Sequence, residues 1–274
     1  MTGFAGETVA VEFEGVAFQV DATRPNDPAW AVLGVRKCGS SMFNRTVKLM
    51  AKFNRVNWID IPGDLFVNNV AVPQWRASPP PPGLLRPGNA YGGFRDYPAG
   101  LAQSPVFQGA IKALLVRDPR DAIVSEYFST RRTHSIPEGA GDDGARADML
   151  RRREAAQQVT IDDFARVEAA KMADTIEQYV PLLEDPKLLL LRYEDVIFAK
   201  ARMICGVADH FGWTVRPEQI DAILKWVDVI PHEENPDAFI RKVTPGDHRE
   251  KLSPETIGEI DRVLEKAMTA FGYR

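Results

Sequence analysis

The residues best suited to chemistry stand in Gly34–Ser41, a loop that the sequence predicts between a strand and a helix. It contains two cations, Arg36 and Lys37, and two hydroxyls, Ser40 and Ser41. At the start of a helix, unpaired backbone N–H groups and the positive end of the helix dipole favour anions. We therefore predict an anion-binding loop, with its cations on the strand side and its hydroxyls on the helix side.

The spacing within this loop does not fit the phosphate-binding signature of nucleoside triphosphatases. That signature, Gly-x4-Gly-Lys-Ser/Thr, places a lysine directly after its second glycine. Here Ser40 follows Gly39, and Lys37 stands two residues before that glycine. A nucleotide kinase is therefore the less favoured alternative for the function of this chain.

A second group of candidate residues follows the predicted strand Lys112–Val116. Arg117 leaves the end of this strand, and Ser125 lies about one helical turn beyond the start of the next helix. A phosphate near the first turn can therefore contact both side chains. The alternative is that Arg117 only caps the helix, through an ion pair with Asp121.

Alternating strands and helices must position these residues. An all-apolar run predicts a buried parallel strand, and apolar residues spaced three or four apart predict a helix. Such strands and helices predict an α/β fold, in which a parallel β-sheet is flanked by helices and strand ends meet at one edge. An alternating pattern also predicts an N-terminal β-hairpin over 9–20. The strands are expected at 31–36, 56–61, 91–94, 112–116 and 188–193, and the main helices at 42–53, 161–180, 217–226 and 254–270.

Length and composition are those of an ordinary folded protein. The 274 residues include 34 basic and 38 acidic side chains, and the net charge of −4 argues against general nucleic-acid binding. We expect a single domain over 1–274, in which 1–28 forms the hairpin and a linker and 134–158 forms a mobile loop with partial helix. No signal peptide or bilayer-spanning stretch is visible, so a cytoplasmic location is expected. Cys38 and Cys205 are predicted to be free thiols.

Four segments in order resemble the sulfotransferases that use 3′-phosphoadenosine 5′-phosphosulfate (PAPS). Lys37–Met42 stands where this family has a Lys-Ser-Gly-Thr-Thr-Trp loop for the 5′-phosphosulfate. Arg117 and Ser125, eight residues apart, match the motif for the 3′-phosphate. The stretch Leu191–Asp195 resembles the strand that brings a tyrosine near the adenine, and Arg241-Lys242 resembles a second 3′-phosphate segment.

This resemblance implies a P-loop-like sulfotransferase fold and a sulfuryl transfer from PAPS to a hydroxyl or amine acceptor. PAPS is then the donor, adenosine 3′,5′-bisphosphate (PAP) is the product, and no metal is required. Lys37 is expected at the bridging oxygen of the donor. The expected donor-binding residues are Arg36, Lys37, Cys38, Gly39, Ser40, Ser41, Met42, Arg117, Ser125, Tyr193, Arg241 and Lys242.

The sequence departs from the family pattern at three places. Met42 replaces a tryptophan that stacks on adenine, and Val243 replaces a glycine. The segment Lys-Thr-His-x-Pro, which supplies the base, has its nearest counterpart in Phe94–Pro98, where Asp96 takes the place of the base. A carboxylate can act as a base near neutral pH when burial raises its pKa. The alternative for Asp96 is an ion pair with Arg95.

Two other side chains are expected to play no part in catalysis. His134 falls in the predicted mobile loop and is expected at the surface. The Cys38 thiol is expected to pack inside its loop.

The resemblance leaves the acceptor and the assembly open. A small molecule, a lipid or a carbohydrate can serve as acceptor, and the chain can be a monomer or a homodimer. Neither nucleic acid nor stable membrane insertion is expected. The missing histidine also keeps open a non-catalytic module that only uses the nucleotide cleft. The tetraproline loop Ser78–Gly83 and the segment 134–158 are expected to flank the acceptor entrance.

Overall fold

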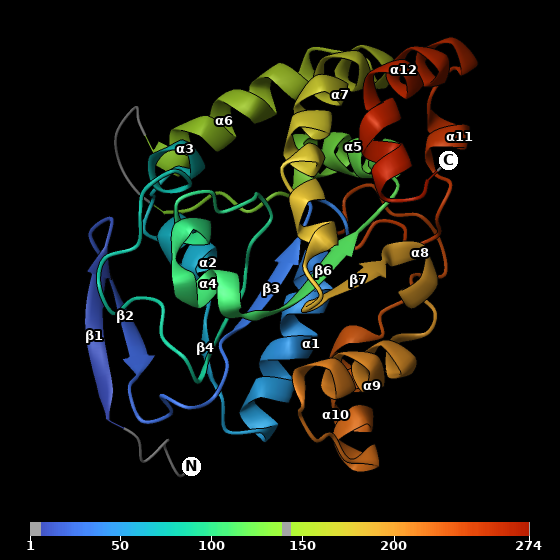
Figure 1. The fold of residues 1–274 in the computed structure, drawn as a ribbon. Coiled ribbons are helices and arrows are strands. Elements are labelled where there is room, and N and C mark those ends of the chain that lie inside the picture. Colours follow the sequence, from blue (N-terminus) through green and yellow to red (C-terminus); the bar gives the residue numbers. More distant parts are fainter. Residues whose placement is uncertain (1–6, 139–143, 274) are drawn as a thin grey trace.

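Five parallel strands form the central sheet of the protein, in the order β4-β5-β3-β6-β7 (Figure 1). The computed structural model describes residues 7–138 and 144–273. The predicted parallel α/β fold is confirmed, although β4 and β5 are only three residues long. The strands are β3 (Trp30–Gly34), β4 (Asn57–Ile59), β5 (Asn89–Tyr91), β6 (Ile111–Val116) and β7 (Leu188–Arg192).

The adjacent strands β3 and β6 contain buried apolar runs, over Trp30–Gly34 and over 113–116. All of β3 is buried, and it pairs with β6 in a register that sets Trp30 beside Ile111 and Gly34 beside Leu115. Strands covered on both faces require apolar side chains throughout. Both strands end at the same edge of the sheet, so the loops at Val35 and Arg117 begin side by side.

The predicted N-terminal hairpin is confirmed. Strands β1 (Thr8–Phe13) and β2 (Val16–Asp21) form a separate antiparallel sheet beside the main one (Figure 1). The side chain of Asn89 ties the hairpin to β5, because its amide accepts from the backbone N of Asp21 and donates to the backbone O of Asp21, both at 2.9 Å. Residues 1–6 of the expected hairpin and linker segment lie outside the described residues.

Helices cover the sheet in two groups. Helix α7 packs against α5 and α12, and α1 packs against α9 and α10 (Figure 1). No helix in the described part of the chain is both long and apolar enough to span a bilayer. The helices are α1 (Ser40–Phe53), α2 (Ile61–Val67), α3 (Val72–Trp75), α4 (Pro105–Gly109), α5 (Pro119–Phe128), α6 (Gly144–Gln157), α7 (Ile161–Glu177), α8 (Tyr193–Val196), α9 (Lys200–Phe211), α10 (Pro217–Val227), α11 (His248–Lys251) and α12 (Pro254–Ala270).

The segment 134–158, expected as a mobile loop with partial helix, is mostly helical. Helix α6 covers fourteen of its residues and buries Ala145, Ala147, Met149 and Ala156. The segment contains too few large apolar residues to show a clear helical period, so the sequence pattern gave little sign of this helix. Residues 139–143 of the segment lie outside the described residues. Its mobility stays a prediction.

Candidate functional site

The loop after β3 presents the start of α1 as predicted. Gly39 is the N-cap of α1, and no side chain caps the helix there, so its first N–H groups are available to a ligand. Gly39 has a φ of 87°, and a Cβ at this position would lie 3.0 Å from the ring of Tyr193. Burial raises the pKa of Cys38 to about 12. The Cys38 thiol is fully buried in the core, which confirms that it packs inside the loop.

A large cavity of about 1500 Å³ brings the predicted donor-binding residues together. It extends from the β3 loop across the ends of β6 and β7, and Asp96 also lines it. Eleven of the twelve donor-binding residues expected from the sequence line this cavity, and the buried Cys38 belongs to the same loop. The eleven are Arg36, Lys37, Gly39, Ser40, Ser41, Met42, Arg117, Ser125, Tyr193, Arg241 and Lys242.

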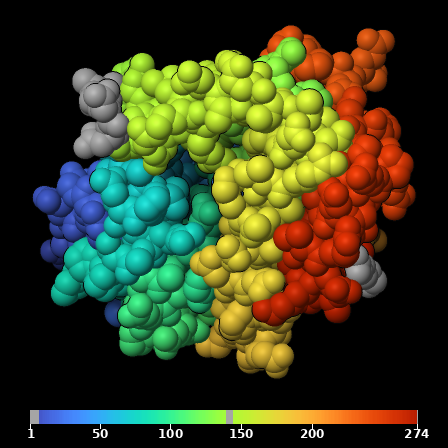
Figure 2. Space-filling view, turned by 90° about the horizontal axis from the view of Figure 1, so that it is seen from above, coloured from blue at the N-terminus to red at the C-terminus, as the bar shows by residue number. Residues whose placement is uncertain are grey.

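The far end of the cavity opens between helices. Figure 2 shows the molecule hollowed between the cyan segment that holds α2 and α3, the yellow-green α6 and the yellow α7. Phe66 of α2, Trp75 of α3, Met149 of α6 and Thr175 of α7 line this end. Of the two segments expected to flank the acceptor entrance, 134–158 contributes α6 to the lining of this end. The tetraproline loop Ser78–Gly83 contributes no residue to the lining described, and α2 and α3 take its place.

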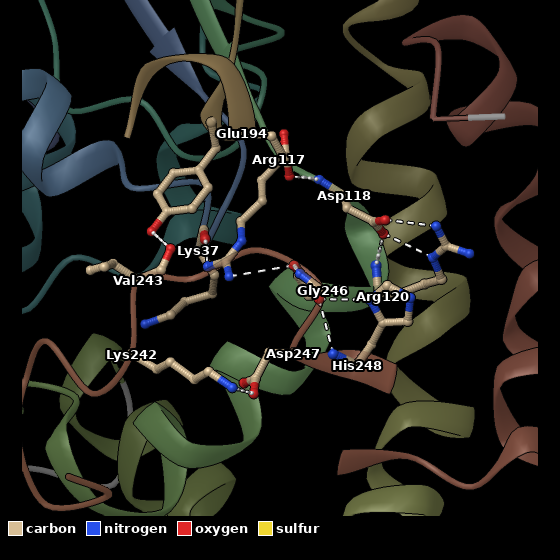
Figure 3. A network of polar contacts seen from close by, with 12 residues as sticks. Lys37, Arg117, Asp118, Arg120, Glu194, Lys242, Val243, Gly246, Asp247 and His248 are labelled. Carbon is tan, nitrogen blue, oxygen red and sulfur yellow. Dashed lines mark hydrogen bonds and ion pairs between the residues drawn. The ribbon is translucent and has the colours of Figure 1, made fainter. Parts of the chain in front are cut away.

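Lys37 lies at the centre of the site without a partner of its own. Its backbone has a φ of 62°, and its carbonyl accepts from Arg117 at 3.3 Å. Among the described residues, its ammonium makes no hydrogen bond or ion pair (Figure 3). Burial lowers the pKa of Lys37, the charge of Glu126 raises it, and the charges of Arg95 and Arg117 lower it. No carboxylate of the described residues pairs directly with this ammonium, although the charge of Glu126 acts on it.

Glu126 of α5 is the buried anion that balances this group of cations. Its carboxylate pairs with Arg152 at 2.6 Å and with Arg36 at 3.8 Å. Burial alone would raise the pKa of Glu126, but the charges of Arg36, Arg152 and Lys37 outweigh burial and lower the pKa to about 2. Glu126 is therefore ionised near neutral pH and holds the cations in place. Its position next to Ser125 gave no signal in the sequence.

Arg95, in the segment after β5, is a further cation beside the Gly34–Ser41 loop, and the sequence analysis did not place it in the site. It donates to the hydroxyl of Ser40 at 3.2 Å and to that of Ser41 at 3.5 Å. No carboxylate pairs with Arg95 in the described part of the chain. Asp96, the residue expected either to pair with Arg95 or to act as base, instead lies 3.6 Å from the Nε of Arg36. The alternative of an Arg95–Asp96 pair is therefore wrong.

Arg117 is buried between Tyr193 and Asp121. Its guanidinium lies 4.4 Å from the centre of the Tyr193 ring, and its Nη2 lies 3.7 Å from Asp121. The hydroxyl of Tyr193 donates to the carbonyl of Val243 at 2.8 Å, which fixes the ring. The Nε of Arg117 is buried and has no partner among the described residues. The ion pair with Asp121 therefore exists, and it leaves donor capacity of Arg117 unused.

Asp121 joins two distant parts of the site. Its buried carboxylate accepts from the backbone N of Gly246 at 2.7 Å and from the backbone N and Nδ1 of His248 at 3.0 and 2.7 Å. Burial alone would raise the pKa of Asp121, but the hydrogen bonds from His248 and Gly246 and the charge of Arg117 lower it to about 2. The carboxylate therefore orients Arg117 and anchors the loop that follows Lys242.

Arg241 and Lys242 line the cavity but are already paired with carboxylates. Arg241 pairs with Glu234 and Asp247, and its guanidinium lies 4.3 Å from the centre of the Phe128 ring. Lys242 pairs with Asp247 at 3.1 Å and with Glu250 at 2.7 Å. These two residues therefore add less net positive charge to the cavity than Arg117 does.

Two exposed aromatic side chains in the same cavity as the Gly34–Ser41 loop were also not predicted from the sequence. Trp226 of α10 and Phe239 line the cavity, although 60% and 65% of their surfaces are exposed. Arg45 lies 4.6 Å from the centre of the Trp226 ring. Exposed aromatic side chains in one cavity indicate a binding surface for a flat apolar group. Neither residue stands in a motif, so only the fold reveals them.

The expectation that His134 lies at the surface is wrong. His134 is half-buried and lines the same cavity as Lys37. Its ring packs edge-on against Phe66, with 6.4 Å between ring centres. The chain turns back toward the cavity in a π-helical turn, Ser129–Thr133, directly after α5. No sequence pattern predicts such a turn, and His134 stands in no recognisable motif. Its position in the cavity could therefore not be predicted.

Comparisons with known proteins agree on one family. The model of the sulfotransferase domain matches residues 97–272. Among solved structures, mouse sulfotransferase SULT7A1 complexed with PAP has a TM-score of 0.57 at 12% identity, over 94% of this chain and 95% of that one. Retinol dehydratase in complex with retinol and PAP has a TM-score of 0.52 at 17% identity, over 95% and 90%. No curated protein sequence matches the chain.

The structural likenesses show the fold, and the domain match shows the family. That match extends over more than half of the chain and includes Arg117, Ser125, Tyr193, Arg241 and Lys242. It favours sulfuryl transfer over the two alternatives of a nucleotide kinase and a non-catalytic module. The protein is therefore an enzyme of the sulfotransferase family.

Proposed function

We propose that the protein transfers the sulfuryl group of PAPS to a hydroxyl or amine of a small-molecule acceptor. The observation that carries this proposal is one cavity that holds both anion-binding loops and opens between α2, α3, α6 and α7. Phe66, Trp75 and Met149 suit an acceptor of lipid character, and the charged side chains of Asp148, Lys171 and Asp174, which also line the cavity, suit a carbohydrate.

The residues present fit an anionic donor. Lys37 and Arg95 have no carboxylate partner in the described chain, and the buried Nε of Arg117 has no partner there. The 5′-phosphosulfate would be held by the loop of Lys37 to Ser41, and the 3′-phosphate by Arg117 and Ser125, with Arg241 and Lys242 beside it. Such charge-assisted bonds are about twice as strong as neutral ones.

The transfer itself requires a leaving group whose growing charge is neutralised. The acceptor oxygen or nitrogen forms a bond to sulfur, and the bond from sulfur to the bridging oxygen breaks. The electron pair of that bond stays on the 5′-phosphate, which leaves as part of PAP. The ammonium of Lys37 would stabilise the negative charge that develops on the bridging oxygen. The acceptor proton must pass to a base.

The experiment that tests this function uses the purified chain and PAPS labelled in its sulfuryl group. A panel of alcohols, phenols, sterols, sugars and amines serves as acceptors. Label is expected in at least one acceptor, and calorimetry is expected to show PAP binding without binding of ATP. Failure to bind PAP would contradict the proposal at its first step.

Trp226 is proposed to stack on the adenine, in the role that Met42 leaves open. Base stacking on an aromatic side chain contributes about 1–3 kcal/mol. Trp226→Ala is therefore expected to raise the Kd for PAP by about 5- to 150-fold. The matched control is Phe198→Ala, because Phe198 is 59% exposed and does not belong to the cavity lining described. Equal affinities of the two variants in calorimetry would exclude Trp226 from the donor site.

A further inference from the structure

The backbone of His134 is fixed on two sides. Its N–H donates to the carbonyl of Ser129 at 2.8 Å, which closes the π-helical turn. Its carbonyl accepts from Arg153 of α6 at 2.6 Å. π-Helical turns are rare and frequently occur at functional sites. The turn and the hydrogen bond from α6 hold His134 at the cavity wall, where a plain continuation of α5 would carry the chain in another direction.

The imidazole of His134 is oriented by ring packing, but its nitrogens make no hydrogen bond to the described residues. Its ring packs against Phe66 with an angle of 78° between the ring planes. Neither ring nitrogen has a hydrogen-bond partner in the part of the chain that the structure describes. The residue lines the same cavity as Lys37, and its neighbour Phe66 belongs to the opening of that cavity. An unpartnered imidazole at this point is available to a bound acceptor.

Burial, together with nearby cations, lowers the pKa of His134 and keeps the imidazole neutral in the free enzyme. Burial lowers its pKa, the charge of Glu126 raises it, and the charges of Lys37, Arg152 and Arg95 lower it, to about 4. A neutral imidazole can accept a proton, and an imidazolium cannot. An anionic donor beside Lys37 and Arg95 offsets two of the three cations. Donor binding therefore makes the imidazole more basic.

We propose that His134 is the general base that removes the proton from the acceptor hydroxyl or amine. This inference rests on the proposed sulfuryl transfer. As the acceptor atom bonds to sulfur, its proton moves to the free nitrogen of the imidazole. The imidazolium then passes that proton to water after PAP and the sulfated product leave, which restores the neutral ring. Glu126 stabilises the imidazolium while it exists.

Asp96 is the competing candidate, because it also lines the cavity. Its carboxylate lies 3.6 Å from the Nε of Arg36, so it is already engaged in an ion pair, whereas the imidazole of His134 has no described hydrogen-bond partner. In our proposal Asp96 orients Arg36, and His134 is the base.

The test compares the variants His134→Gln and Asp96→Asn with wild type on an acceptor that the wild-type enzyme sulfates. Loss of a general base lowers kcat by about 10²- to 10⁴-fold, and this loss is expected for His134→Gln with the affinity for PAP unchanged. Exogenous imidazole is expected to restore part of the rate in His134→Gly. The control is His232→Gln, since His232 is exposed and outside the cavity.

A spectroscopic measurement separates a catalytic role from a structural one. The chain has 4 histidines, so the His134 resonance in a proton NMR titration can be identified by its loss in His134→Gln. Its pKa is expected near 4 in the free enzyme and higher in the complex with PAP. A pKa that stays near the ordinary value of about 6.5 in both states would contradict the inference.

The outcomes also distinguish this inference from the proposed function. If wild type sulfates no acceptor and binds no PAP, the proposed function fails. If wild type is active and His134→Gln keeps its kcat, only the assignment of the base fails. A loss of kcat in Asp96→Asn with a fully active His134→Gln would transfer the role to Asp96.

Discussion

Replacing Lys37 by methionine is expected to lower kcat by about 100- to 1,000-fold, which corresponds to about 2.7–4 kcal/mol of transition-state stabilisation. The lysine has no carboxylate partner in the described chain, and Arg95 and Arg117 repel its charge. Its ammonium therefore interacts most strongly when negative charge grows on the bridging oxygen. Because this charge appears in the transition state, the affinity for PAP is expected to change little.

Single-turnover transfer of labelled sulfate measures this effect without interference from product release. Lys48→Met is the matched control, because Lys48 is an exposed lysine of α1, the helix that follows the Lys37 loop, and it does not line the main cavity. Calorimetry with PAP on each variant separates binding from chemistry. An undiminished rate in Lys37→Met would remove this residue from the mechanism.

Replacing Arg117 by alanine is expected to weaken PAP binding by about 10- to 150-fold, the equivalent of about 1.5–3 kcal/mol for a hydrogen bond to a charged group. The buried Nε of Arg117 has no described partner, so the residue can bond a phosphate without losing its contact with Asp121. AMP lacks the 3′-phosphate. Wild type is expected to bind AMP more weakly than PAP, and Arg117→Ala is expected to bind AMP as well as wild type does.

Two control variants distinguish a loss of phosphate binding from a loss of folded structure. Arg120→Ala removes a cation of the same motif that pairs with Asp118 and Asp261 and does not line the described cavity, so PAP affinity should be retained. Arg117→Lys keeps the charge beside the buried Asp121 and loses the planar fork that binds phosphate. A parallel loss of affinity for PAP and AMP in Arg117→Ala would refute the assignment to the 3′-phosphate.

The central part of the fold could be predicted because its local signals are strong. The strand β3 and residues 113–116 of β6 are continuous apolar runs, and α12 is capped by Ser253, whose hydroxyl accepts from the N of Thr256 at 3.2 Å. The short elements gave weaker signals, since the strand expected at 56–61 is only Asn57–Ile59 and the one expected at 91–94 lies at Asn89–Tyr91. Strands β4 and β5 have three residues each, and α3 has four, so pairing and packing with distant segments decide their structure.

The candidate site could be predicted where residues stand in motifs and not where distant segments meet. Lys37 and Arg117 line the cavity because each follows the end of a strand, and Ser125 lines it from the helix α5 that follows β6. Asp96 faces Arg36 because the loop after β5 crosses the end of β3, which no local pattern encodes. The position of His134 depends on a π-helical turn and on α6. The hydrophobic periodicity of the sequence predicts neither of them.

The three hydrogen bonds that Gly246 and His248 make to Asp121 have a consequence for how the protein is made. Asp121 precedes these partners by 125 and 127 residues. During vectorial synthesis all five sheet strands therefore leave the ribosome before the partners of Asp121 are translated. Until then its buried carboxylate lacks three of its donors. The enzyme consequently becomes competent to hold its donor only near the end of translation.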